Sequence, residues 1–138
     1  MTIIEAVKTF IKTYGPLTNA TIMVDYLGEE PIQYAIIPLP GTRVLERYIT
    51  SGSLREFPFA FQAMASTADE LERLETNGFF EAFADWLETQ TEAGALPVLA
   101  AGKTAERVEA VNAGYIMQQG ESSTAVYQVT CRLEYSQT

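Results

Sequence analysis

The chain has 138 residues, of which 47% are hydrophobic, and this size and composition fit one domain with its own core. Its formal net charge is −9 with nine scattered Lys and Arg residues, so it lacks the basic stripe of a direct nucleic-acid binder. The absence of His and the single Cys exclude imidazole-dependent catalysis, a conventional zinc site and an intrachain disulfide. We therefore expect a single domain over residues 1–138 that is not an enzyme and uses no metal or cofactor.

The first predicted element is an amphipathic helix. Apolar residues recur at spacings of three and four, which places them on one helical face: Ile4, Val7, Phe10, Ile11 and Tyr14. Gly15-Pro16 is expected to end the helix, the glycine by a left-handed cap and the proline by its ring.

Two short alternating segments follow, over residues 22–26 and 32–36, and they predict a hairpin with one buried face. Glu29-Glu30 lies between them. This pair could serve as an acid/base or hard-metal site, but the neighbouring Gly28 and Pro31 favour a solvated turn.

Residues 38–54 have no clean periodicity and predict a long loop or arm. Connections of this length in compact domains are usually functional or disordered. A third strand is then indicated by Phe57, Phe59, Phe61, Ala63 and Ala65, which share one face. Because the chain is acidic, we interpret this aromatic row as a core face and not as a platform for stacking bases. Pro58 cannot donate to a sheet ladder, so it predicts an edge strand or a bulge.

The second helix is predicted to open at Ser66 or Thr67, which are followed three residues later by Asp69 and Glu70 in the pattern of a capping box. Its apolar side comprises Leu71, Leu74, Phe79, Phe83, Trp86 and Leu87, and Asn77-Gly78 is expected to kink or split it. Its acidic residues are interpreted as a solvated outer face: Asp69, Glu70, Glu72, Glu75, Glu81, Asp85 and Glu88.

Two further strands are predicted over about 106–118 and 124–135. Cys131 occupies an alternating position in the last one, where a free thiol acts as a small core residue. The predicted fold is α+β, with a mostly antiparallel sheet, two main helices packed on one face, and the order α-β-β-β-α-β-β.

Four segments together resemble the minor capsid and tail-terminator proteins of long-tailed bacteriophages and prophages. They are residues 34–38, 55–61, 67–86 and 127–135, which include Tyr34-Ala35-Ile36-Ile37-Pro38 and the strand Arg55-Glu56-Phe57-Pro58-Phe59-Ala60-Phe61. The resemblance implies a tail-terminator-like domain that forms a homo-hexameric ring, caps the tail tube, stops its polymerisation and joins tail to head. The implied partners are further copies of the chain, the tail-tube protein and a head-completion or connector protein, with DNA only passing through the lumen and no membrane.

The family has no catalytic residues, so the resemblance directs attention to interfaces. We expect the arm and the strand after it to contact an adjacent subunit or the tube through Arg43, Leu45, Arg47, Tyr48 and Arg55. The expected location is the virion, at the head–tail junction, after synthesis in the bacterial cytoplasm. Two alternatives remain: another head–tail connector or tail-tube component, and a small ligand-binding α+β domain.

Overall fold

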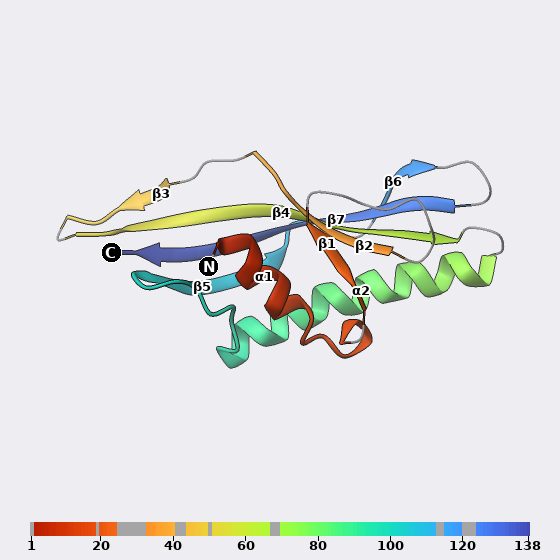
Figure 1. The fold of residues 1–138 in the computed structure, drawn as a ribbon, viewed down its shortest axis with the longest axis horizontal. Coiled ribbons are helices and arrows are strands. Elements are labelled where there is room, and N and C mark those ends of the chain that lie inside the picture. The colour runs from red at the N-terminus through yellow and green to blue at the C-terminus, as the bar shows by residue number, and fades with distance from the viewer. Residues whose placement is uncertain are drawn as a thin grey trace.

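The computed structural model describes residues 2–18, 20–24, 33–40, 44–49, 51–66, 70–112, 115–119 and 124–138. Their elements are, in chain order, α1 (Ile3–Ile11), the 3-10 turn η1 (Gly15–Leu17), β1 (Ile22–Val24), β2 (Gln33–Pro38), β3 (Val44–Arg47), β4 (Ser53–Ser66), α2 (Glu70–Ala93), β5 (Lys103–Ala110), β6 (Tyr115–Gln119) and β7 (Thr124–Gln137) (Figure 1). The α+β class and the mostly antiparallel sheet are confirmed. The predicted order is wrong, because four strands precede α2 and three follow it.

Strands β4 and β7 form the central ribbon of the sheet. They pair antiparallel over their full length, from Ser53 opposite Gln137 to Ser66 opposite Thr124. Fourteen residues in each strand correspond to a ribbon of roughly 45 Å. On the β4 side lie β2 and β3, with β1 outside β2, and on the β7 side lie β5 and β6. The shorter strands therefore extend the ribbon in two separate halves.

One face of this ribbon is the core, as the alternation in the sequence predicts. Phe59, Phe61 and Ala63 of β4 are buried. The buried hydrophobic residues of β7 are every second one along the strand: Ala125, Tyr127, Val129, Cys131, Leu133 and Tyr135. Since side chains alternate between the two faces of a strand, both strands present one continuous apolar surface.

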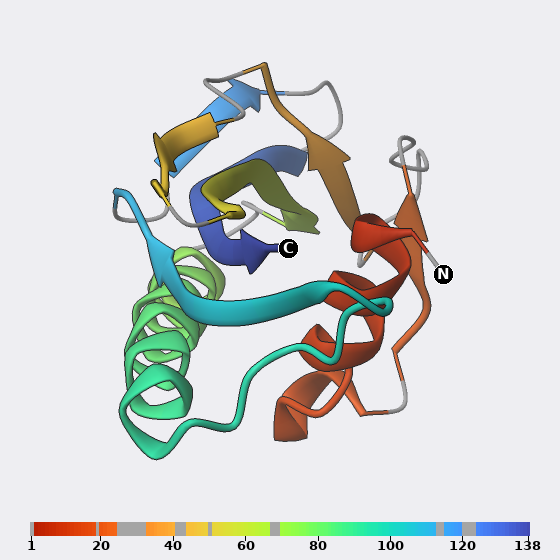
Figure 2. The same cartoon turned by 90° about the vertical axis from the view of Figure 1, so that its left-hand side faces the viewer.

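Both helices cover that surface. Val7, Phe10 and Ile11 of α1, and Phe80, Phe83 and Leu87 of α2, belong to the same buried cluster as the β4 and β7 residues. The ring of Phe83 stacks on Phe61 with centroids 4.7 Å apart, and Phe10 contacts Trp86 at 4.9 Å. Figure 2 shows the two helices side by side beneath the ribbon. The predicted packing of two helices on one face is confirmed for the described residues.

The predicted hairpin of residues 22–26 and 32–36 is wrong in its strand direction. Strands β1 and β2 pair in parallel, with Ile22 opposite Tyr34 and Val24 opposite Ile36. An alternating pattern defines which face of each strand is buried but not the direction in which two strands pair. Glu29 and Glu30 lie outside the described residues.

Pro58 lies in a central strand, not at an edge as predicted. Its carbonyl accepts from the N–H of Leu39, just beyond the last β2 residue, and β3 pairs only further along β4, with Val44 opposite Arg55. The β2 ladder ends at Phe59 and the β3 ladder at Arg55, so Pro58 lies between the two ladders on this side of β4. No ladder hydrogen bond is needed there, so the central strand tolerates a proline.

The end of the first helix differs from the prediction. Helix α1 ends at Ile11, and Lys12 caps it in a right-handed conformation with φ −67°, whereas Gly15 begins η1. The left-handed cap at Gly15 is therefore wrong. At its start, Thr2 and Glu5 form a capping box that stabilises the first turn.

Helix α2 continues through Asn77-Gly78, so the predicted split is wrong. Thr67 and Asp69 of the proposed cap lie outside the described residues, as do the side chains of Leu71 and Leu74. Phe83 and Leu87 are buried and Phe79 and Trp86 pack against the core. Within the described part of the acidic face, Glu81, Asp85 and Glu88 are exposed, as predicted.

Candidate functional site

The predicted arm contains a strand. Residues 44–47 form β3, which pairs antiparallel with the first residues of β4, and we call residues 44–49 and 51–55 the β3–β4 hairpin. It lies at one end of the molecule and extends beyond the C-terminus of the chain (Figure 1). The expectation of an arm without secondary structure is corrected by this pairing.

The β3–β4 hairpin exposes large apolar side chains. Leu45 is 40% exposed, Tyr48 43%, and Ile49 105%, while the other exposed large hydrophobic residues of the described chain, Val24, Val98 and Val111, lie in different segments. Exposing apolar area to water is unfavourable by about 25 cal/mol per Å². A cluster of such side chains at a projecting end is typical of a contact surface.

The turn of this hairpin is held firmly. The N–H of Tyr48 donates to the carbonyl of Gly52 at 3.1 Å, and Gly52 adopts φ +87°. A Cβ at Gly52 would lie 2.8 Å from the backbone oxygen of Gln137, closer than atoms normally approach. Only glycine fits here, so the turn is packed directly against the C-terminal end of β7.

The hairpin brings three of the five predicted interface residues together. Leu45, Arg47 and Tyr48 are all exposed on it. Arg55 is half-buried at the base, where its Nε donates to Ser53 Oγ at 2.9 Å, so it supports the hairpin instead of extending from it. Arg43 lies outside the described residues. Ile49 was missed, although its place beside Tyr48 in a segment without periodicity was a usable signal.

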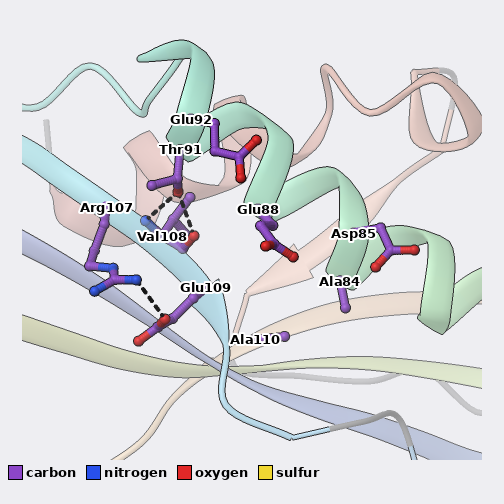
Figure 3. Close-up of a pocket in the computed structure, with 9 residues that line it drawn as sticks. All are labelled: Ala84, Asp85, Glu88, Thr91, Glu92, Arg107, Val108, Glu109 and Ala110. Carbon is purple, nitrogen blue, oxygen red and sulfur yellow. Dashed lines mark hydrogen bonds and ion pairs between the residues drawn. The ribbon is translucent and has the colours of Figure 1, made fainter.

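A groove of about 410 Å³ runs between α2 and β5 (Figure 3). Its helical wall carries the carboxylates of Asp85, Glu88 and Glu92, whereas on the strand side Arg107 pairs with Glu109, which also bonds Arg132 on the opposite sheet face. The three helical carboxylates follow the spacing i, i+3, i+7, which places them on one stripe of the helix. They form no ion pair within the described part of the chain, so the groove is negatively charged.

Thr91 fastens α2 to the outer edge of β5. Its hydroxyl donates to the carbonyl of Val108 at 2.7 Å and accepts from the N–H of the same residue at 3.1 Å. An unpaired strand edge is a template for another strand. One side chain therefore occupies the two backbone groups that an added strand would use at this position.

On the sheet face opposite the helices, Arg132 is surrounded by three carboxylates. Its guanidinium bonds Glu109 and lies 3.7 Å from Glu56 and 3.8 Å from Glu134. The hydrogen bond to Glu109 raises the pKa of Arg132, and the charges of all three carboxylates act in the same direction. The cluster links β4, β7 and β5 across the open face of the sheet.

Metal ligation and thiol reactivity can be judged for the described residues. They contain no group of three or more His, Cys, Asp and Glu side chains arranged to hold a metal ion. Cys131 is fully buried, and its burial raises the pKa of the thiol, so no reactive thiolate is presented. A second cavity of about 370 Å³ lies beside Leu39, Phe57 and Tyr135 and is lined mainly by apolar surface with one carboxylate, Glu56.

No protein-family model matches the chain, and no curated protein is significantly similar to it. Among the described helices, none has both the length and the apolar character needed to cross a membrane.

Proposed function

We propose that this protein is a structural component of a long-tailed bacteriophage or prophage, resembling the tail terminators. In this proposal, copies of the chain form a ring, commonly of six, which caps the tail tube, stops its polymerisation and provides the surface for joining the head. DNA passes through the lumen of the ring.

The observation that carries the proposal is the exposed apolar end of the β3–β4 hairpin. Leu45, Tyr48 and Ile49 are exposed on a hairpin whose turn is packed against β7 at Gly52. A rigid projection with apolar side chains suits contact with a neighbouring subunit, and a contact between two different surfaces closes a ring when it is repeated by rotation. The excess of acidic residues over basic ones, 18 against 9, is compatible with a lumen that repels DNA.

The test removes the apolar end without disturbing the core. Tyr48→Ser combined with Ile49→Ser is expected to abolish ring-sized species in light scattering and to leave tail tubes uncapped, and therefore longer, in electron micrographs of mixtures with tail-tube subunits. Val98→Ser is the matched control, because Val98 is 81% exposed but lies outside the hairpin. Rings and tube lengths that do not respond to the double substitution would remove the hairpin from the proposal.

A further inference from the structure

The exposed hairpin and the acidic groove are complementary surfaces of the same chain. We infer that the hairpin of one copy docks into the α2–β5 groove of a second copy. This inference rests on the proposed function, since it names the subunit contact that would build the ring.

Charge is the first argument for this pairing. The groove contains Asp85, Glu88 and Glu92, none of them in an ion pair within the described residues. Arg47 is exposed on the β3–β4 hairpin and is likewise free of any ion pair within the described residues. Opposite charges that meet at an interface steer association and fix the register of the two partners.

Apolar surface is the second argument. Val111 directly follows Ala110, a groove-lining residue at the end of β5, and it is 57% exposed. The hairpin presents Tyr48 and Ile49 beside its cation. Contact between these side chains and Val111 would remove apolar area from water while Arg47 meets the carboxylates.

The other occupants are less well matched. Nucleic acid and other anions would be repelled by the groove carboxylates. Lys8 of α1 and Lys12 at its C-terminal cap are alternative cations, but no exposed large hydrophobic residue lies on α1. Among the described basic segments, the hairpin combines a free cation with exposed apolar side chains, so a second copy of this chain is the partner that fits.

The contact joins two different parts of the chain, so it is heterologous when it is repeated head to tail, whereas a reciprocal two-fold exchange of hairpins would stop at a dimer. A two-fold dimer that used the hairpin on both sides would leave each groove empty. Head-to-tail docking instead uses every hairpin and every groove once in a closed ring. The chain has an overall charge of −9, so copies repel at long range and the local attraction must be strong at short range.

Charge exchange tests the pairing. Arg47→Glu and Glu88→Arg are each expected to weaken association at least about tenfold, and the chain that carries both is expected to recover most of the loss, as close charge pairs do. Glu81→Arg is the control, because Glu81 is an exposed acid on the same helix that does not line the groove. Association is measured by light scattering, with tail-tube subunits added where assembly requires them.

Cross-linking tests the contact directly. A chain with Tyr48→Cys mixed with a chain with Glu88→Cys is expected to form an intersubunit disulfide, whereas each variant alone is not. Cys131 gives no background, because it is buried.

The outcomes separate the two proposals. If Glu88→Arg and Glu81→Arg weaken association equally, or if the Tyr48→Cys chain alone forms disulfides, the hairpin does not dock into the groove. The proposal that the chain forms a ring would remain. A wild-type chain that stays monomeric even with tail-tube subunits would overturn both.

Discussion

At the scale of single residues, two glycines in different surroundings predict opposite effects of the same substitution. Gly52→Ala forces a Cβ to within 2.8 Å of the Gln137 carbonyl at a φ of +87°, and we expect a loss of at least about 1–2 kcal/mol in the free energy of unfolding. Gly78→Ala meets nothing within 4 Å in α2 and is expected to add about 0.5–1 kcal/mol. Denaturant unfolding of both variants checks this, and a neutral Gly52→Ala would contradict the packing of the turn.

Cys131 predicts a specific dependence of stability on pH. Burial raises the pKa of its thiol above the ordinary value of 9.0, so above pH 9 the folded chain retains a proton that the unfolded chain has lost. The buried thiol therefore makes its full contribution to the free energy of unfolding below pH 9, and this contribution falls as the pH rises further. Burial also raises the pKa of Tyr14 and Tyr34, which act in the same direction.

The comparison with Cys131→Ala isolates the thiol, since both tyrosines are present in both proteins. The wild type is expected to be more stable at pH 7, because the alanine leaves a cavity. The difference in the free energy of unfolding between wild type and Cys131→Ala should decrease between about pH 9 and 10.5, by up to about 1.4 kcal/mol per pH unit. A constant difference across this range in urea unfolding would show that the thiol titrates equally in both states.

Arg132 predicts a charge effect on the open face of the sheet. Arg132→Gln leaves Glu56, Glu109 and Glu134 without their shared counterion, and we expect a loss of about 1 kcal/mol at neutral pH, since the cluster is partly exposed and screened. Arg132→Lys keeps the positive charge, so we expect it to lose less stability than Arg132→Gln. High salt should reduce the loss in thermal unfolding. A salt-independent loss would point to packing of the arginine stem instead.

At the scale of elements, Thr91 provides the sharpest test of how α2 joins the sheet. Thr91→Val keeps the shape but removes both hydrogen bonds to Val108, and we expect a loss of about 1–3 kcal/mol together with faster amide exchange at Val108. Thr89→Val is the control, because that hydroxyl only donates to the Asp85 carbonyl on the exposed helix face. Equal losses of stability and equal amide exchange at Val108 in the two variants would contradict the role of Thr91 at the β5 edge.

The elements also show what the sequence could predict. The alternation in β4 and β7 and the apolar spacing of α1 correctly identified the core, because each has one buried face. Strand β3 was missed because three of its four residues are exposed and no alternation results. The break between β5 and β6 was missed as well. There the side chain of Asn112 accepts from the N–H of Thr130, and the apolar pattern of the sequence cannot predict this contact.

The candidate site was only partly predictable for similar reasons. The hairpin residues were identified from a long segment without periodicity, which indicates exposure but not shape. The acidic stripe of α2 was visible in the sequence, yet its groove forms only when β5 packs beside the helix. The direction of β1 against β2 also depends on the whole sheet, so alternation within each strand could not provide it.

At the scale of the whole molecule, the proposed function depends on whether copies of the chain assemble into a closed ring. A tail terminator stops tube growth, whereas a tail-tube component would continue into tubes and a ligand-binding domain would stay a defined monomer or dimer that binds a small molecule saturably. Mass and tube length therefore separate the three classes of protein.

The most direct measurement is the mass of the purified wild-type protein by light scattering over a wide concentration range, alone and with tail-tube subunits. We expect a ring-sized species, near six times the 15.2 kDa of one chain, either alone or on mixing, together with arrested tube growth. A monomer whose mass is independent of concentration and which leaves tube growth unchanged would contradict the account.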